Sequence, residues 1–388
     1  MTLIVNHQKF DMVRGVAAIT VFLAHICQIF WYRHLGVDHF LVDILGTFAR
    51  HAVLVFFLLS GYLITLSILA NIKKNNKFNK VEYIASRIAR IYPPLIGTIL
   101  VIVIIWAVIY IFDLPGKYSY RLSTDLYVAR EMFFISFTDI VRALSMKNGL
   151  LDADGPLWSL YIEFHIYILA LLATVAITTK GLALRIFLII LSVLFFTSWF
   201  SADHSFVFFS IVWFIGCFAA IVIHTSVYNN FIKLYKHICI LLFVVVFSLL
   251  LFSPYSLSIS NPNAILNYGV QIGISFCYTY IIFFSKLLDK NSSELLSKTG
   301  SFSYSLYIVH FPLLLLTLSI FQNWIGVSLL NTAIISCLMI VLVLFFSYIF
   351  SRVFEQQVVF KPIVQKFLLK VNMLFHKVIL ELKLVNKR

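Results

Sequence analysis

The sequence predicts an all-α, polytopic membrane protein with about ten transmembrane helices and both termini in the cytoplasm. Hydrophobic residues make up 61% of the 388 residues, charged residues make up only 12%, and the mean hydropathy is +0.97. A water-soluble chain of this length could not bury so much apolar surface. Apolar runs of about 20 residues recur between short polar loops, as is typical of helices that cross a bilayer.

The apolar runs give the predicted order of the membrane helices. We expect spans at residues 12–31, 48–69, 91–112, 157–177, 183–201, 205–224, 238–256, 266–287, 302–321 and 329–353. The first span is expected to stay in the mature protein, because Asp11 and Arg14 interrupt what a cleavable signal peptide would need. We therefore divide the chain into a membrane domain, residues 1–356, and a basic amphipathic cytoplasmic tail, residues 357–388, suited to a surface of anionic lipid.

The positive charges decide the orientation. Lysines and arginines gather in alternate loops, beginning with Asn71–Lys80, and in the C-terminal tail, whereas loops such as Ser253–Asn263 carry no charge. This alternation follows the positive-inside rule with both termini in the cytoplasm, and an odd number of spans would break it. The formal net charge of +14 is therefore interpreted as a topology signal, and no binding of nucleic acid is predicted.

The cysteines do not predict a metal site. The chain has five cysteines, all within apolar runs and none in a Cys-x-x-Cys pair. Neither a disulfide framework nor a zinc site follows from such spacing.

The segment from residue 113 to residue 156 does not fit the pattern of spans. Within it, Leu126 to Met146 is apolar but interrupted by charges such as Arg130 and Asp139. It is too charged to span the membrane, so we expect an interfacial or re-entrant helix that covers the outer end of the bundle.

The first span and the residue before it carry three ionisable side chains. Arg14 and His25 are eleven residues apart, so on a helix they share a face at a separation of about 16 Å. Asp11 lies three residues before Arg14. Ionisable groups within lipid are costly and usually functional. The alternative is that Arg14 reaches the lipid headgroups and His25 binds a neighbouring helix.

Two further arginines lie at the cytoplasmic start of the third span. Arg87 and Arg90 are three residues apart and share a helix face. Paired guanidinium groups at a membrane surface suit phosphate or pyrophosphate, which they bind bidentately. Anchoring by the positive-inside rule is the alternative.

The fourth span begins with a polar face. Trp158, Ser159 and Glu163 follow Pro156, which suits the first turn of a helix. Glu163 and His25 lie at similar depths below the outer surface. We expect a hydrogen bond in which Glu163 orients His25 as a general base. A structural pair that joins two helices is the alternative.

The remaining candidates come from the ninth and second spans. Tyr307 and His310 lie one turn apart near the middle of the membrane, and Pro312 is expected to kink the helix. Structural and site-lining roles are both open for these two side chains. Ser60 and Gly61 allow the close approach of a neighbouring helix or a thin ligand.

Five motifs in this order resemble the acyltransferase 3 family of integral-membrane O-acyltransferases. They are Val-Arg-Gly with a His eleven residues on, Phe-Phe-x-Leu-Ser-Gly-Tyr-Leu, Arg-x-x-Arg-Ile-x-Pro, Trp-Ser-Leu-x-x-Glu and Ser-Tyr-x-Leu-Tyr-x-x-His-x-Pro. The resemblance covers about residues 8–356. The chain departs from the family pattern at Ala52, where a Gly is frequent, and after Glu355, where a nearby Pro is missing.

The resemblance implies transfer of an acyl group, usually acetyl, from cytoplasmic acetyl-CoA to a hydroxyl of a cell-envelope glycan such as O-antigen, capsule or exopolysaccharide. It implies a catalytic role for His25, an acyl-CoA site at Arg14, Arg87 and Arg90, and no bound cofactor. It also implies a multi-pass protein of the bacterial cytoplasmic membrane, here in a form without a fused extracellular domain.

The donor and acceptor assignments leave alternatives. Direct transfer and an acyl-His intermediate at His25 are both open. A glycolipid transporter or flippase, or a glycan polymerase, would also have many spans, basic loops and ionisable groups at mid-membrane. The Arg87-x-x-Arg90 pair favours the acyltransferase, because a flippase has no need of a CoA site.

Overall fold

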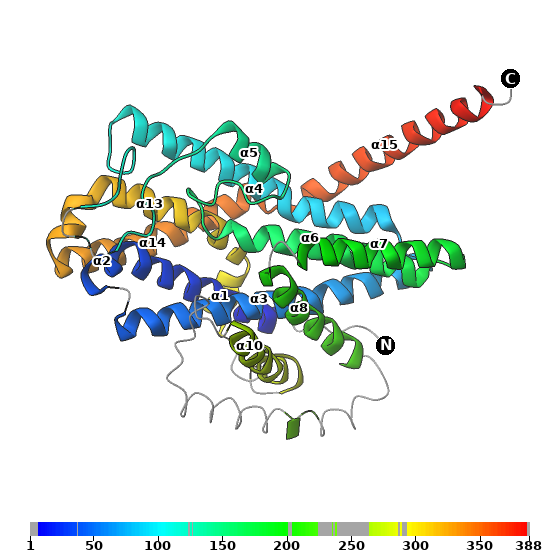
Figure 1. The fold of residues 1–388 in the computed structure, drawn as a ribbon, viewed down its shortest axis with the longest axis horizontal. Coiled ribbons are helices and arrows are strands. Elements are labelled where there is room, and N and C mark those ends of the chain that lie inside the picture. Colours follow the sequence, from blue (N-terminus) through cyan, green and yellow to red (C-terminus); the bar gives the residue numbers. More distant parts are fainter. Residues whose placement is uncertain are drawn as a thin grey trace.

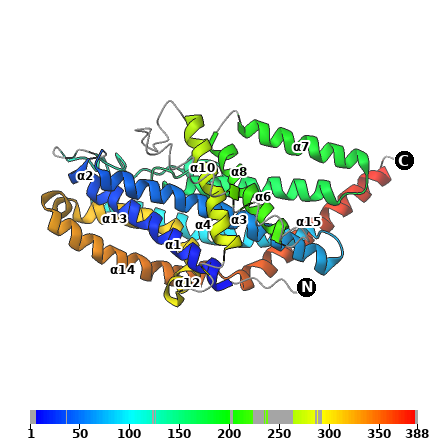
Figure 2. The same cartoon turned by 90° about the horizontal axis from the view of Figure 1, so that it is seen from below.

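The computed structural model describes residues 7–36, 38–122, 125, 127–200, 204–223, 235, 237–238, 264–285, 288 and 293–385. Every regular element of these residues is helical, and the long helices lie side by side in one bundle (Figures 1 and 2). The first half contains α1 (His7–Ile26), the π-helix η1 (Cys27–Trp31), α2 (Tyr32–Leu35), α3 (Phe40–Asn75), α4 (Lys80–Ile111), α5 (Phe137–Leu144) and α6 (Leu157–Thr178). The second half contains α7 (Leu182–Phe200), α8 (His204–Ile223), α10 (Ala264–Thr279), the π-helix η2 (Tyr280–Phe284), α12 (Glu294–Gly300), α13 (Ser303–Val327), α14 (Leu329–Phe354) and α15 (Gln357–Val385).

The helices confirm the predicted all-α membrane class. Within the described ranges, seven helical stretches are long and apolar enough to cross a membrane, and two shorter apolar helices cover Leu182–Thr197 and Tyr268–Phe284. These nine match nine of the expected spans. The expected span 238–256 and the Ser253–Asn263 loop lie outside the described residues. The total of about ten spans and the cytoplasmic position of the termini stay predictions.

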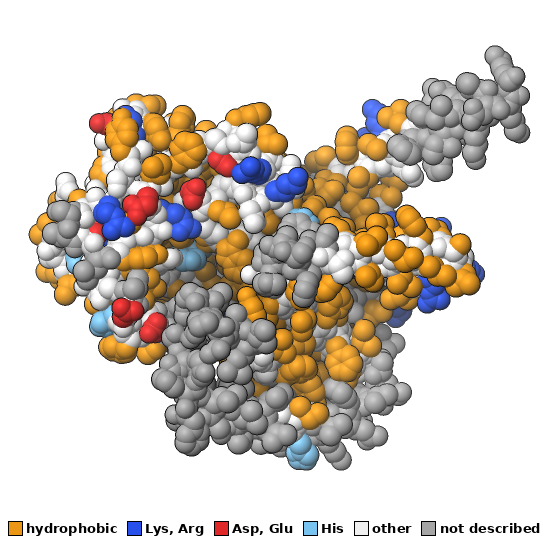
Figure 3. All heavy atoms as spheres, in the orientation of Figure 1, with side chains coloured by type: hydrophobic (Ala, Val, Ile, Leu, Met, Phe, Trp, Pro, Cys, Tyr) orange, Lys and Arg blue, Asp and Glu red, His pale blue; other side chains and the backbone are white. Residues whose placement is uncertain are grey.

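The side surface of the bundle is apolar. Large hydrophobic side chains point outward, such as Ile104, Phe187 and Val341, which are 61%, 60% and 65% exposed. On the face shown in Figure 3, hydrophobic side chains are exposed over α7 and α8, and most charged side chains lie over the segment between α4 and α6 and at the ends of the view. Such a belt is what lipid tails would cover.

The segment between α4 and α6 corrects one expectation. Among the described residues of this segment, α5 is the one helix, with a capping box formed by Ser136 and Asp139, so a helix over the whole of Leu126–Met146 is wrong and a shorter one is present. The backbone preceding α5 forms hydrogen bonds with other parts of the same segment instead. The N–H of Tyr120 donates to the carbonyl of Glu131 at 2.7 Å. Glu131 also forms an ion pair with Arg121 at 2.7 Å. These long-range contacts compete with the helix that the apolar composition favours.

Glycines bring the backbones of site-bearing helices together. A Cβ at Gly61 of α3 would lie 2.0 Å from the carbonyl oxygen of Trp213 in α8, and one at Gly216 would lie 2.1 Å from the carbonyl oxygen of Leu58. The close helix approach expected at Gly61 is therefore confirmed. The resulting contact places α8 directly behind Ser60.

Helix α13 runs through Pro312. Its backbone leaves the helical region at Phe321, where φ is −112° and ψ is 19°. A bend of the helix axis at Pro312 stays a prediction. Ile308, Phe311 and Leu315 around it are almost completely buried, and this packing holds the helix despite the missing N–H.

Helix α15 follows α14 and leaves the bundle (Figure 1). The basic tail is helical over Gln357–Val385. Lys361 near its start lies 3.6 Å from Glu82 of α4. Its position on a lipid surface stays a prediction.

Candidate functional site

Two neighbouring cavities occupy the centre of the bundle. The smaller has a volume of about 100 Å³ and is called the arginine cavity here; the larger has about 430 Å³ and is called the histidine cavity. Val53 and Tyr307 line both, so the cavities share a wall. Polar residues of the arginine cavity are Arg14, Ser60, Arg87, Arg90, Ser159, Glu163, Tyr167, Ser303, Tyr304 and Tyr307. Those of the histidine cavity are His25, Gln28, Tyr32, Arg50, Trp158, Ser205, Tyr268, Gln271 and Tyr307.

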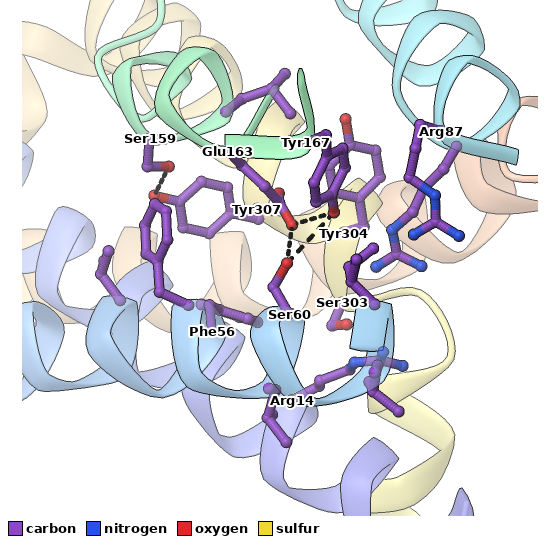
Figure 4. Close-up of a pocket in the computed structure, with 17 residues that line it drawn as sticks. Arg14, Phe56, Ser60, Arg87, Ser159, Glu163, Tyr167, Ser303, Tyr304 and Tyr307 are labelled. Carbon is purple, nitrogen blue, oxygen red and sulfur yellow. Dashed lines mark hydrogen bonds between the residues drawn. The ribbon is translucent and has the colours of Figure 1, made fainter. Parts of the chain in front are cut away.

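Three arginines converge on the arginine cavity. Arg14 reaches it from α1 and Arg87 from α4 (Figure 4). Arg90, one turn after Arg87 on the same face of α4, lines it as well. Arg14 donates to Asp11 at 3.1 Å. Within the described ranges, neither Arg87 nor Arg90 has an acid at ion-pair distance, and the buried Nε of Arg87 and hydroxyl of Tyr304 have no hydrogen-bond partner. An anionic ligand with several acceptor oxygens would satisfy buried donors of this kind.

Glu163 lies in the arginine cavity and not beside His25. Its Oε1 accepts from the hydroxyl of Ser60 at 2.8 Å and from the hydroxyl of Tyr167 (Figure 4). Ser60 also accepts from Nε1 of Trp213 at 3.2 Å. The expected hydrogen bond between Glu163 and His25 is therefore wrong. The similar depth expected for the two side chains does not bring them together, because they line different cavities.

His25 lies at a local change of helix type. It occupies the last turn of α1, and η1 follows directly, with the backbone N–H of Tyr32 donating to the carbonyl of Cys27 five residues earlier. Inserted π-helical turns re-aim side chains and are frequent at functional sites. Here the residues on either side of the change, His25 and Gln28, both line the histidine cavity.

A chain of hydrogen bonds determines which nitrogen of His25 is free. Nδ1 of the fully buried His310 lies 2.8 Å from the carbonyl oxygen of Leu306, which can only accept, so this Nδ1 carries hydrogen. Nε2 of a neutral His310 is then an acceptor, and it lies 2.7 Å from Nδ1 of His25. His25 must donate from Nδ1, which leaves its Nε2 with an unshared electron pair. That is the form a general base needs.

Residues of the segment between α4 and α6 pack near this histidine pair. The ring of Phe311 lies edge-on to His25, with centroids 5.2 Å apart, and the guanidinium of Arg130 lies 5.0 Å from the Phe311 ring. Asp154 is completely buried nearby, and neither of its carboxyl oxygens has a hydrogen-bond partner among the described residues. Burial raises the pKa of the Asp154 carboxyl well above its usual value, although Arg130 opposes the shift.

The wall between the cavities is held by a hydrogen bond. The hydroxyls of Ser159 and Tyr307 are 2.8 Å apart. Because Ser159 also lies 3.2 Å from the carbonyl oxygen of Pro156, it donates there and accepts from Tyr307. The ring of Phe56 lies edge-on against Tyr307, with centroids 5.6 Å apart.

The other expected site residues divide between the two cavities. Trp158 lines the histidine cavity and its neighbour Ser159 the arginine cavity. Asp11 and His310 line neither; Asp11 binds Arg14 and His310 binds His25. Across the ranges described above, no three His, Cys, Asp or Glu side chains are grouped closely enough to hold a metal ion.

Several lining residues were not predicted. Tyr304 precedes Tyr307 by one turn in the same motif, and this spacing is a signal that could have found it. Arg50, Gln28 and Gln271 line the histidine cavity. Of these three, only Arg50 could have been found from the sequence, because it is a cation near the start of the apolar run 48–69.

Comparison with known proteins gives a family match. A family model described as an acyltransferase domain matches residues 7–352. Nodulation protein 10 of Rhizobium leguminosarum bv. viciae is 27% identical over 168 residues, which cover 42% of this chain and 43% of that protein. An uncharacterized protein of Haemophilus influenzae is 30% identical over 155 residues, which cover 38% of this chain and 60% of that protein. The matches thus span less than two thirds of either relative, and no solved structure matches the chain.

Proposed function

We propose a specific reaction for this chain, which belongs to the acyltransferase 3 family of membrane O-acyltransferases. It transfers an acyl group, here acetyl, from cytoplasmic acyl-CoA to a hydroxyl of a cell-envelope glycan, in the cytoplasmic membrane of a bacterium. One observation carries the proposal. The histidine whose Nε2 is left free lines a cavity that shares a wall with a cavity of three arginines. A donor and an acceptor can therefore meet at that wall.

The arginine cavity suits the donor. The phosphate groups of CoA are anionic, and arginine binds phosphate with two parallel hydrogen bonds. Arg87 and Arg90 have no competing acid at ion-pair distance within the described ranges, whereas Arg14 is held by Asp11. We assign the first two to the phosphates and Arg14 to the part of the donor nearer α1.

The shared wall suits the passage of the acyl group. Tyr307 lines both cavities, and the hydrogen bond between its hydroxyl and Ser159 holds its ring in the shared wall. An acetyl thioester held beside Tyr307 lies against the cavity that contains His25. The charged phosphates stay in the arginine cavity, and only the small, neutral acyl end has to reach the acceptor.

The histidine cavity suits a sugar. Tyr32, Trp158 and Tyr268 offer aromatic faces, and Gln28 and Gln271 offer amides that both donate and accept hydrogen bonds. Apolar and aromatic surface with a few polar groups is typical of small-molecule sites, and the volume of about 430 Å³ lies in their range.

The chemistry follows from the free nitrogen of His25. Nε2 takes the proton of the acceptor hydroxyl as its oxygen attacks the thioester carbonyl carbon. The carbon–sulfur bond then breaks, and the CoA thiolate leaves and takes the proton from Nε2. Donation from Nδ1 to His310 holds the ring in place throughout. A two-step route through an acyl-His25 intermediate uses the same nitrogen.

The proposed function is tested with the purified protein in lipid nanodiscs, acetyl-CoA labelled in the acetyl group, and glycan extracted from bacterial envelopes. We expect label in the glycan as an alkali-labile ester, together with one free CoA thiol for each ester formed. Label that stays with acetyl-CoA, in protein that binds acetyl-CoA, would contradict the proposal.

A further inference from the structure

Arg50 gives the histidine cavity a positive charge. It comes from α3 and is the only Lys, Arg, Asp or Glu among the described residues that line this cavity. Its Nη2 donates to the hydroxyl of Thr47 at 2.9 Å. One hydrogen bond uses one of the five N–H donors of a guanidinium, so most of these donors can bind another partner.

No acid neutralises Arg50 in the described ranges. Two arginines of neighbouring segments form ion pairs: Arg33 lies 2.7 Å from Asp125, and Arg121 lies 2.7 Å from Glu131. Asp43, seven residues before Arg50 in α3, acts on its charge only from beyond ion-pair distance. Arg50 has no carboxylate within ion-pair distance in the same residues. A partly buried cation without a paired acid is unfavourable, and an anionic ligand would offset that cost.

The placement of Arg50 relates this charge to the acceptor. It shares the cavity with His25 and with the aromatic rings of Tyr32 and Trp158. A molecule that presents a hydroxyl to His25 and a sugar face to these rings is therefore bound in the same cavity as the guanidinium. A planar guanidinium binds carboxylate and phosphate groups bidentately, which neutral hydroxyls do not match.

We propose that the acceptor is an acidic saccharide, with a carboxylate or phosphate that Arg50 binds while His25 takes the proton of a nearby hydroxyl. This inference rests on the proposed function and narrows its substrate class. A carboxylate would come from a uronic acid in the glycan, and a phosphate from a sugar phosphate or a lipid-phosphate carrier.

The test uses three probes that differ in charge. They are octyl β-glucoside, octyl β-glucuronide and an octyl glucosyl phosphodiester, each titrated below its micellar concentration into the protein in nanodiscs. We expect the carboxylate or the phosphate probe to bind about tenfold or more tightly than the neutral probe, as a charge-assisted contact does. The tighter of the two charged probes identifies the source of the anion.

The variants Arg50→Gln and Arg142→Gln give the contrast. Arg142 is exposed on α5 and lines neither cavity, so its variant should keep the preference for the charged probe, whereas Arg50→Gln should lose it. Binding of acetyl-CoA shows that each variant is folded. Arg50→Lys should retain part of the preference.

Three results would overturn the inference: equal binding of neutral and charged probes, a preference that survives in Arg50→Gln, or no binding of any probe. Acetyl transfer from labelled acetyl-CoA to bulk envelope glycan is measured in the same preparation. Transfer without a preference for charged probes removes the acidic acceptor but keeps the acyltransferase. Loss of transfer to every glycan removes the proposed function itself.

Discussion

Replacing His310 with phenylalanine tests how His25 is oriented. The fully buried ring of His310 lies 2.7 Å from Nδ1 of His25 and is oriented by the carbonyl of Leu306 at 2.8 Å. Phenylalanine keeps the ring volume but removes the acceptor. A buried donor without a partner costs about 1–3 kcal/mol, and His25 can then carry its hydrogen on Nε2 and lose the free electron pair.

We therefore expect the turnover number of His310→Phe to fall about 5- to 150-fold, which is the same free energy expressed as a rate. The Michaelis constant for acetyl-CoA should change little, because His310 does not line the arginine cavity. His310→Gln places an amide oxygen near the position of Nε2 and should restore part of the rate. The assay is acetyl transfer per unit of folded protein in nanodiscs.

The rates of the two variants separate orientation from structure. A structural role for His310 would lower the yield of folded protein but leave the rate per folded molecule unchanged. A wild-type rate for the phenylalanine variant would refute the role of the His25–His310 hydrogen bond in catalysis. Equal rates for the phenylalanine and glutamine variants would refute the need for a group that accepts from Nδ1 of His25.

Three other predictions follow from the geometry. Arg87→Ala and Arg90→Ala should each weaken acetyl-CoA binding about tenfold or more in a direct titration, with Lys restoring only part of the affinity; unchanged affinity would reduce the pair to topology anchors. Gly61→Ala should destabilise the protein by about 1–3 kcal/mol, since its Cβ would lie 2.0 Å from a backbone oxygen, whereas Gly269→Ala, with nothing within 4 Å, should not; equal melting temperatures would contradict this. Asp154→Asn should raise the melting temperature at neutral pH. The pKa of Asp154 is raised in the fold, so its protonated form favours the folded state at acidic pH and this stability is lost as pH rises. The gain in melting temperature from Asn should therefore be smaller in acid. A gain that does not change with pH would contradict the pKa shift.

Features of the fold that depend on a single helix could be predicted from the sequence. Hydropathy located the spans, and the spacing of Arg87 and Arg90 placed both guanidinium groups on one face of α4. Apolar composition failed between residues 113 and 156, where backbone pairing between Tyr120 and Glu131 replaces the expected helix. Such pairing depends on distant residues that a local average does not include.

The pairing of side chains across helices was harder to predict. Depth along the membrane normal put His25 and Glu163 at one level, but it gives no rotation about the helix axes. The actual partner of His25 is His310, from α13, and the turn of π-helix after His25 leaves no mark in the hydropathy. Sequence spacing found many of the residues that line the site but missed Tyr304 and Arg50, and the packing of the helices decides which side chains meet.

The central claim is that His25 is the base for acyl transfer, and the most direct measurement is the transfer rate of His25→Ala. Acetyl ester formed in glycan is compared per unit of folded protein for wild type, His25→Ala and the control His165→Ala, whose histidine is buried in α6 and lines neither cavity. Loss of a general base lowers the rate about 10²–10⁴-fold. We predict a loss of this size for His25→Ala with acetyl-CoA binding intact, and near wild-type transfer for the control. Near wild-type transfer by folded His25→Ala would contradict the account.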